Sequence, residues 1–273
     1  MVDLPHTETL ELELAGGWLT IWFNRPESRN ALSDALRDDL LAVLACVRDE
    51  RAVRGITLRG RGGIFCAGGD LKQFQSGSQA KASAEEVRRL SRDGASLFDA
   101  INTAPQVVVA VIEGGATAGG FGMACCADVV ICEKSARFAM TETMIGLSPA
   151  QIAPFVIARL GYATARRLML TGARFDAVEA AAFGFADSLC EGAGGLDAQE
   201  AQVRKQVLAC APGAIADTKA LILALPGMAR GDVIELAADN FACRMLSDEA
   251  QEGIASFVEK RKPAWVPVPG EGQ

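Results

Sequence analysis

The sequence contains a single histidine, His6, and this scarcity excludes several kinds of enzyme. A catalytic serine or cysteine needs a base beside it to become nucleophilic, and imidazole is the usual base. A nucleophilic role for Cys66 therefore lacks its partner. The pattern G-x-S-x-G, which places a nucleophilic serine on a sharp turn, does not occur either. The sequence thus argues against nucleophilic catalysis by serine or cysteine.

Metal-binding patterns are missing as well. The eight cysteines form no C-x-x-C pair, so the usual ligand spacings of a zinc site are absent. Cys125, Cys126 and Cys132 lie inside apolar stretches, where a reduced cysteine behaves as a small hydrophobe. We expect no metal and no cofactor, and the lack of a disulfide framework fits a reducing, cytoplasmic setting.

Long apolar runs and an excess of basic residues are also lacking. Half of the residues are apolar, yet no uninterrupted run approaches the roughly 20 residues that a membrane span requires. The first residues, MVDLPHTETLELEL, carry acids and no basic stretch, so no secretory signal is expected. The formal net charge of −7 disfavours a broad nucleic-acid surface. The expected partners therefore include neither a membrane nor a nucleic acid.

What the sequence does contain is an alternation of short apolar strands and helices. The strands expected from composition are Trp18–Phe23, Gly55–Leu58, Val107–Ile112 and Val129–Cys132. Ser33 can cap a helix whose apolar face repeats at helical spacing from Leu36 to Val47. Such alternation predicts βαβ units and a mostly parallel sheet. After Pro149 the pattern predicts helices only.

This change of pattern divides the chain into three parts. Residues 1–195 are expected to form an α/β core, residues 196–265 a C-terminal helical region, and residues 266–273 a flexible tail. Helical appendages with apolar faces often pack on another subunit, so a homo-oligomer is consistent with this organisation.

Two glycine-rich loops each follow a predicted buried strand, at Ala67–Asp70 and Gly114–Gly122. Glycine lets the backbone approach a ligand and point its N–H groups outward. The second loop leads into a short helix predicted at Phe121–Ala127, so amides near Gly119 would lie at the positive end of the helix dipole. Two such amides converging on one point would form an oxyanion hole. Taken alone, each loop is better explained as a tight turn packed for steric reasons.

Two further observations bear on this region. The spacing of the glycines at the end of the second loop does not give G-x-G-x-x-G, which argues against a dinucleotide site. Glu142 follows an apolar stretch, and desolvation there would raise the pKa of its carboxyl toward the range of a general acid or base. Taken alone, an isolated glutamate is more often a solvated or capping residue.

Four ordered motifs give the chain a more specific signature. They are Asn24–Leu32 (NRPESRNAL), Phe65–Lys72 (FCAGGDLK), the glycine segment Gly114–Asp128, and Phe257–Arg261 (FVEKR). With these motifs the chain resembles the enoyl-CoA hydratase/isomerase (crotonase) family from about Leu12 to Trp265. The resemblance implies an α/β fold, a crotonase-like spiral of ββα units with a C-terminal helical trimerisation region. It also implies a homotrimer or a dimer of trimers.

The resemblance implies roles for the residues at motif positions. The amides of Gly69 and Gly119 would form the oxyanion hole for a thioester carbonyl, and Glu142 would be the catalytic acid and base. The residues expected to bind the acyl-CoA substrate are Arg29, Ala31, Ala67, Gly68, Asp70, Leu71, Lys72, Gly122, Thr141, Phe257 and Lys260. Of these, Phe257 and Lys260 are expected to reach the coenzyme A site of a neighbouring subunit.

The sequence departs from the family at Gly122, where typical hydratases carry a first catalytic glutamate. Gly122, the pair Thr141-Glu142 and the loop of residues 146–154 look like the bacterial branch that hydrates 3-methylglutaconyl-CoA and isohexenylglutaconyl-CoA. Such a substrate carries a distal carboxylate. A glutamate at position 122 would repel it by on the order of a few kcal/mol at an effective dielectric constant near 20.

The departure leads to expectations about the acyl pocket. We expect glycine at position 122 to leave room for a branched acyl chain. Ile152, Pro154 and Phe155 are expected to supply an apolar wall, and Arg137 is a candidate cation for the substrate carboxylate.

Two other functions remain open. A single glutamate suffices for a Δ3-Δ2 enoyl-CoA isomerase, which moves one proton between the α- and γ-carbons. A non-catalytic scaffold or RNA-binding homologue would retain the same fold, although the acidic balance of the chain disfavours binding to phosphates.

Overall fold

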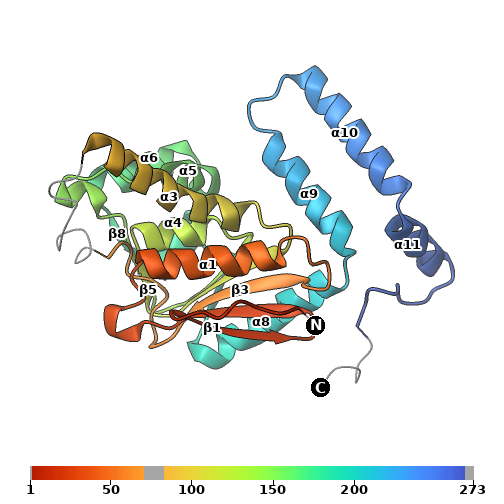
Figure 1. The fold of residues 1–273 in the computed structure, drawn as a ribbon, viewed down its shortest axis with the longest axis horizontal. Helices are drawn as coiled ribbons and strands as arrows, with labels where there is room; N and C mark the ends of the chain where they lie inside the picture. Colours follow the sequence, from red (N-terminus) through yellow and green to blue (C-terminus); the bar gives the residue numbers. More distant parts are fainter. Residues whose placement is uncertain (1, 71–82, 268–273) are drawn as a thin grey trace.

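The computed structural model describes residues 2–70 and 83–267, and a six-stranded sheet lies at its centre (Figure 1). The strands in spatial order are β1 (Leu10–Ala15), β2 (Trp18–Phe23), β3 (Gly55–Gly60), β4 (Val107–Ile112), β6 (Val129–Glu133) and β9 (Ser188–Cys190). β1 pairs antiparallel with β2, and all other neighbours in this sheet are parallel. The prediction of a mostly parallel sheet is confirmed.

Strand β4 shows why the central strands are apolar throughout. Val108 and Ala110 pack in one hydrophobic cluster, whereas Val109 and Val111 pack in a second cluster. Successive side chains of a strand point to opposite faces, so a strand covered on both sides needs an apolar residue at every position.

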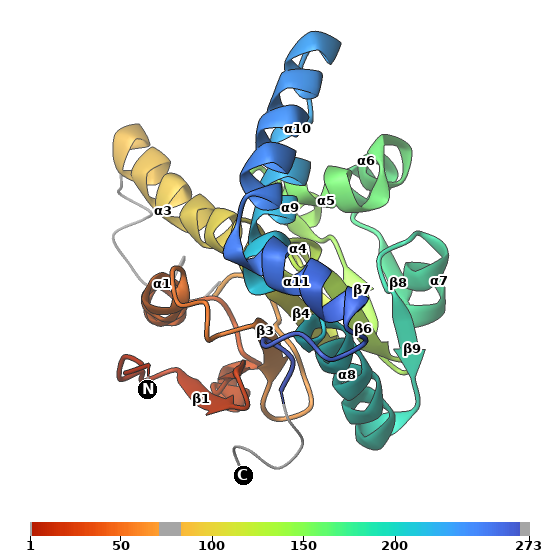
Figure 2. The ribbon, with the colours of Figure 1, turned by 90° about the vertical axis from the view of Figure 1, so that its right-hand side faces the viewer.

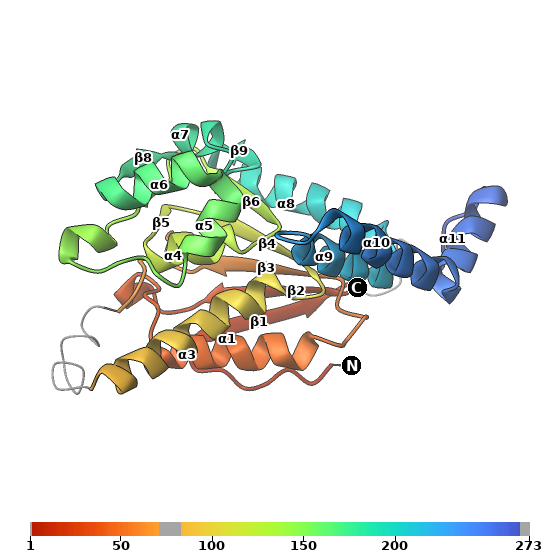
Figure 3. The same ribbon diagram turned by 90° about the horizontal axis from the view of Figure 1, so that it is seen from above.

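Helices cover both faces of this sheet. α1 (Asp34–Val47) and α3 (Ala84–Asn102) lie on one side, and α8 (Gly192–Leu208) lies on the other (Figure 3). The Ser33 hydroxyl accepts a hydrogen bond from the Leu36 amide at 3.2 Å, as the sequence predicts for a cap. Leu196, in α8, packs in the same cluster as residues of β2, β4 and β6. The core therefore extends through α8, and the predicted boundary at residue 195 falls inside that helix.

A smaller second sheet lies beside the site described below. It consists of β5 (Gly115–Thr117), β7 (Arg137–Ala139) and β8 (Arg174–Asp176). The remaining elements of the core are 3-10 helices η1 (Pro26–Ser28) and η3 (Glu142–Ile145) and helices α4 (Gly119–Cys125), α5 (Ala153–Leu160), α6 (Tyr162–Thr171) and α7 (Ala177–Ala182). The expectation of helices only after Pro149 is wrong, because β8 and β9 follow it. Strands of three residues are too short to show a period of two in sequence.

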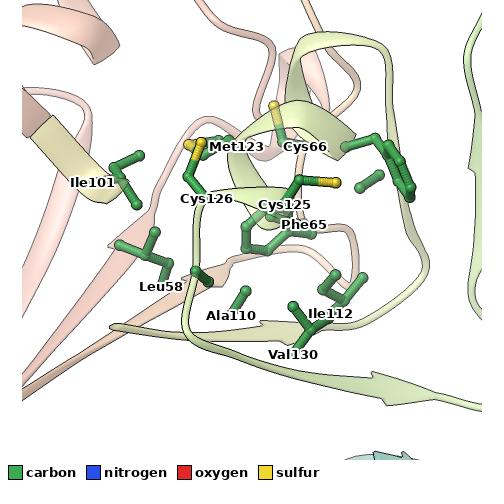
Figure 4. Close-up of a cluster of buried hydrophobic side chains, with 14 of the residues drawn as sticks. Leu58, Phe65, Cys66, Ile101, Ala110, Ile112, Met123, Cys125, Cys126 and Val130 are labelled. Atoms are coloured by element: carbon green, nitrogen blue, oxygen red, sulfur yellow. The ribbon is translucent and has the colours of Figure 1, made fainter. Parts of the chain in front are cut away.

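Sulfur-containing side chains fill the core around α4. Cys66, Cys125 and Cys126 lie among the apolar side chains of Phe65, Met123 and their neighbours (Figure 4). These cysteines are buried and free. Burial raises the pKa of the Cys66 thiol to about 12, so the thiol stays neutral. The expectation that buried cysteines act as small hydrophobes is confirmed at these positions.

Three further helices extend away from this body (Figures 1 and 2). They are α9 (Pro212–Ala224), α10 (Arg230–Met245) and α11 (Asp248–Val258). None of the residues of α10, all of which the structure describes, is buried. The side chains of Phe241, Leu246 and Phe257 are 69%, 80% and 85% exposed. These helices therefore present apolar surface that the body of the same chain does not cover.

The segment after α11 returns to the body. Arg54, which precedes β3, donates a hydrogen bond to the carbonyl oxygen of Trp265 at 2.8 Å and another to that of Cys210. Burial lowers the pKa of the Arg54 guanidinium. One buried arginine thus joins the sheet to both ends of the helical extension.

Across residues 2–70 and 83–267 we find no single helix with the length and apolar character of a membrane span. Only α8 and α9 taken together, with a bend of 99° between them, satisfy those two criteria.

Candidate active site

One cavity of about 350 Å³ brings the three predicted catalytic residues together. Its wall is built by the start of α1, the first glycine loop, α3, the turn into α4, and residues 141–152. Gly69, Gly119 and Glu142 all line this cavity. Segments distant in the sequence thus meet at one site.

The first glycine loop is held against the segment that precedes α1. The Leu32 amide donates to the carbonyl oxygen of Gly68 at 2.8 Å, and the Asp70 amide donates to that of Leu32 at 3.1 Å. Gly68 has a φ of +89°, and a Cβ there would lie 2.7 Å from the carbonyl oxygen of Thr117, so the position requires glycine. The Gly69 amide has no acceptor within the described part of the chain.

The second glycine loop turns sharply at Ala118, which has a φ of 50° and a ψ of −122°. The Ala118 amide donates to the carbonyl oxygen of Ala139 at 2.8 Å, and this bond fixes the turn against β7. Helix α4 then begins at Gly119, whose N–H belongs to the first turn and has no partner inside the helix. A Cβ at Gly119 would lie 4.0 Å from the Gly69 nitrogen, so the two loops are adjacent.

Glu142 is the first residue of η3 and is half-buried beside the cavity. Its Oε2 atom is buried and has no hydrogen-bond partner among the described residues. Burial raises the pKa of the Glu142 carboxyl above its ordinary value, and a hydrogen bond with its own backbone amide offsets part of this shift. A desolvated carboxyl in this setting can exchange a proton with a bound molecule.

Some of the predicted substrate-binding residues lie at the cavity and others lie behind it. Ala67 and Thr141 line it. Gly68 is buried and shapes the loop. Arg29 accepts a hydrogen bond from the Ala67 amide through its carbonyl oxygen at 3.0 Å and lines a different cavity. Ala31 is buried next to the loop. The last three therefore support the loop that forms the wall.

The end of the second motif, Phe65–Lys72, is described only in part. An Asp70 carboxylate oxygen lies 3.6 Å from an Arg25 guanidinium nitrogen, which ties the end of the loop to the first motif. Leu71 and Lys72 fall outside the described residues, so their predicted contact with coenzyme A stays a prediction.

Phe257 and Lys260 lie at the end of α11, on the extension rather than at the cavity of their own chain. Phe257 is 85% exposed. Their predicted contact with the substrate of a neighbouring subunit stays a prediction.

Gly122 does not leave room for a substrate. It is buried in α4, and a Cβ at this position would lie 2.5 Å from the Cβ of Ile152. The side chain of Ile152 is itself buried and occupies that space. The interpretation of Gly122 as a substrate-binding residue that opens the pocket is therefore wrong, because the glycine accommodates Ile152 instead.

The apolar wall also differs from the expected one. Ile152 lines the cavity, but Pro154 and Phe155 do not belong to its described lining. The other large apolar residues of the wall are Leu32, Leu90, Leu97, Phe98, Ile145 and Leu147. Three of these come from α3, whose contribution to the pocket depends on a tertiary contact that the sequence does not reveal.

Arg37 is a cavity residue that sequence analysis missed. It lies on α1 and lines the cavity, whereas Arg137, the expected cation, lines a separate cavity with Arg29 and Arg174. The available signal is weak: Arg37 follows the buried Leu36 and so lies at the edge of the buried face of α1. Periodicity alone does not show that α3 and the loop after Glu142 enclose that edge.

A cavity with two adjacent glycine amides and a half-buried carboxyl can stabilise charge on a carbonyl oxygen and move a proton beside it. The sequence model of the family described as "Enoyl-CoA hydratase/isomerase" matches residues 13–267. The chain belongs to the enoyl-CoA hydratase/isomerase family and is an enzyme of this group.

Individual relatives support the same assignment. The solved structure titled "Pseudomonas aeruginosa AtuE" has 46% sequence identity and a TM-score of 0.92, covering 95% of this chain and 100% of that one. An enoyl-CoA hydratase/isomerase from Marinobacter aquaeolei has 38% identity and a TM-score of 0.91, covering 95% and 99%. The human mitochondrial enoyl-CoA hydratase domain-containing protein 2 is 32% identical over 261 residues, 92% of this chain and 86% of that protein. The predicted family and crotonase fold are confirmed.

Proposed function

We propose that the protein adds water across the α,β double bond of a branched glutaconyl-type acyl-CoA, such as 3-methylglutaconyl-CoA or isohexenylglutaconyl-CoA. The observation that carries the hydratase assignment is the Glu142 carboxyl. Its Oε2 is buried without a partner among the described residues, in a cavity that it shares with Gly69 and Gly119.

The mechanism uses these three residues in order. The thioester oxygen accepts hydrogen bonds from the Gly69 and Gly119 amides, which draws electron density from the double bond and makes the β-carbon electrophilic. The ionised Glu142 takes a proton from a water molecule, whose oxygen bonds to the β-carbon. The resulting enolate takes that proton back from Glu142 at the α-carbon, and the carboxylate is restored. Atoms balance without a cofactor, because coenzyme A is part of the substrate.

The lack of a second catalytic glutamate at this cavity supports a substrate with its own carboxylate. Among the described lining residues the acids are Asp34 and Glu142, and Asp34 is paired with Arg37 at 2.7 Å. Gly122 adds no second glutamate, so a distal carboxylate avoids the repulsion that typical two-glutamate members would impose. The apolar wall of Leu97, Phe98 and their neighbours suits a branched or isoprenoid chain.

The test is the substitution Glu142→Gln, which keeps the shape of the side chain and removes the base. We expect hydration of 3-methylglutaconyl-CoA, followed by loss of enoyl absorbance, to fall by at least about 10²-fold. A panel of crotonyl-, 3-methylglutaconyl- and isohexenylglutaconyl-CoA identifies the acyl group. Turnover at the wild-type rate in the glutamine variant would rule out the proposed role.

A second candidate is a Δ3-Δ2 enoyl-CoA isomerase, which the single buried glutamate favours. The isomerase moves a proton from the α- to the γ-carbon, or the reverse, and adds no oxygen. Incorporation of ¹⁸O from labelled water into the product separates the two reactions. A product that contains no label would replace the hydratase proposal with the isomerase.

We infer that the chain assembles into a homotrimer or a dimer of trimers. The exposed apolar side chains of α10 and α11 support this inference, because isolated chains rarely leave so many large apolar residues in water. In such an assembly Phe257 and Lys260 would contact the coenzyme A of another subunit. A scaffold without catalytic activity would bind no acyl-CoA, and a thermal-shift titration with acyl-CoA tests this alternative.

A further inference from the structure

The catalytic cavity contains one basic side chain among its described lining residues, that of Arg37. The same lining carries Glu142, Gly69 and Gly119, and apolar side chains of α3 complete the wall. A guanidinium is charged at every physiological pH. A guanidinium, paired with the Asp34 carboxylate at 2.7 Å, therefore lies beside the part of the cavity that suits an acyl chain.

Arg37 is less exposed to solvent than the two carboxylates that pair with it. Its Nη1 donates a hydrogen bond to Asp34 at 2.7 Å, and its Nε donates to Asp38 at 2.9 Å. The side chain of Arg37 is 18% exposed, whereas those of Asp34 and Asp38 are 51% and 65% exposed. The guanidinium is thus withdrawn from solvent, while the two carboxylates that pair with it reach into water.

We propose that Arg37 binds the distal carboxylate of the acyl chain and so selects substrates that carry one. This inference rests on the glutaconyl substrate class proposed above, and it assigns the recognition of that class to one residue.

Two physical arguments support the assignment. Nη1 pairs with Asp34, and Nε and Nη2 both lie within 2.9 Å of one Asp38 oxygen, but Nη1 and Nη2 each carry two N–H groups, so the planar guanidinium retains donors for a carboxylate in the cavity. Ion pairs with exposed carboxylates contribute little, so a substrate carboxylate can share or replace one of them at small cost. A substrate carboxylate inside the cavity is less hydrated than the exposed Asp38 carboxylate. Its electrostatic attraction to the Arg37 guanidinium is therefore stronger at the same distance.

The experiment measures binding of two unreactive saturated thioesters, glutaryl-CoA and pentanoyl-CoA, to the full-length protein by calorimetry. They have the same chain length and differ in the terminal carboxylate. We expect wild-type protein to prefer glutaryl-CoA, and Arg37→Met to lower that preference at least about tenfold, as for loss of a charge-assisted hydrogen bond. Arg37→Lys should retain part of it, because the charge remains while the planar fork is lost.

Two further variants serve as matched controls. Arg48→Met removes an exposed arginine at the end of the same helix, away from the cavity lining, and should leave the preference unchanged. Asp38→Asn removes a competing carboxylate and should raise the preference for glutaryl-CoA by about twofold. This increase is expected even if Arg37→Met proves too unstable to measure.

The outcomes separate this inference from the proposed reaction. A wild-type protein without preference for glutaryl-CoA, or an Arg37→Met variant that keeps it, overturns the role of Arg37. If the preference depends on Arg37 but the wild-type protein does not hydrate 3-methylglutaconyl-CoA, the role of Arg37 stands and the proposed reaction fails.

Discussion

Ile152 occupies the space that any side chain at position 122 would need. A Cβ built on Gly122 would lie 2.5 Å from the Cβ of Ile152, well inside the distance of closest approach between such atoms. The loop after Glu142 and helix α4 are therefore matched to each other through a residue without a side chain. Packing against Ile152 is therefore sufficient to exclude a second glutamate at position 122.

The first prediction follows from this contact. Gly122→Ala should lower the free energy of unfolding by about 1–3 kcal/mol, the usual cost of overpacking a core. Replacing Ile152 by Ala in the same chain removes the Cγ2 atom, which would lie 2.2 Å from the new Cβ, and should recover part of the loss. Urea unfolding measures both effects. As a control, Gly94→Ala, in α3 with no atom within 4 Å of the new Cβ, should stabilise the chain slightly. Independent, additive effects at positions 122 and 152 would contradict the proposed contact.

The second prediction concerns the geometry of the oxyanion hole. Gly68→Ala should reduce kcat/KM by about 10²-fold or more. The new methyl group would collide with the carbonyl oxygen of Thr117, and the shift of the loop that relieves this collision would move the adjacent Gly69 amide out of position. Gly63→Ala is the matched control: its φ of +69° carries a similar backbone penalty, but nothing lies within 4 Å of the added Cβ. Steady-state hydration kinetics of both variants test the idea. An equal loss in the two variants would point to backbone strain alone.

The third prediction concerns pH and activity. Glu142 must be ionised to take a proton from water, and burial raises the pKa of its carboxyl. The ordinary pKa of a glutamate carboxyl is about 4.3. The loss of activity on acidification should therefore have its midpoint at a higher pH than this value. The pH profile of kcat/KM shows this limb. In Glu142→Gln the residual activity should lack it, and a limb that persists would belong to another group.

The fourth prediction concerns pH and stability. A pKa that is higher in the folded chain means that folded protein holds the proton more tightly than unfolded protein. Glu142 therefore destabilises the fold increasingly as the pH rises from the ordinary carboxyl pKa through the raised one. Glu142→Gln should be more stable than the wild type above this window, and the difference should shrink below it. Urea unfolding at pH 4 and pH 8 measures the change, and a difference independent of pH would contradict it.

The fifth prediction concerns assembly. Replacing Phe241 and Leu246 by Glu should shift the chain to smaller species, since both side chains are largely exposed on the extension. Sedimentation velocity reports the masses. Glu235→Gln on α10 changes a charge without removing an apolar group and is the control. An unchanged mass in the double variant would show that Phe241 and Leu246 do not form the subunit interface.

The sequence predicts the parts of the fold that depend on local pattern. The strands at residues 18–23 and 107–112 are found with the predicted bounds, because composition and length identify a strand buried on both faces. Strands β8 and β9 were missed because three residues show no period. For the site, the motifs identify Gly69, Gly119 and Glu142 as candidate residues, and the structure shows that all three line one cavity.

What the sequence could not predict are contacts between distant elements. Gly122 looked like an opening, since a glycine does not reveal which side chain lies above it. Arg37 was not identified as a cavity residue, because α3 and the loop after Glu142, which enclose it, come much later in the sequence. Both errors concern the surroundings of a residue rather than its own preferences.

The hydrogen bonds of Arg54 have a consequence for synthesis of the chain. This arginine stands just before β3, but its carbonyl partners belong to Cys210 and Trp265. Until residue 210 has been synthesised the guanidinium has neither of these partners, and until residue 265 has been synthesised it lacks the second. The early strands can pair before the last helix emerges, yet this corner of the sheet closes only when translation is almost complete. Chains that terminate early should therefore present an open corner to chaperones and proteases.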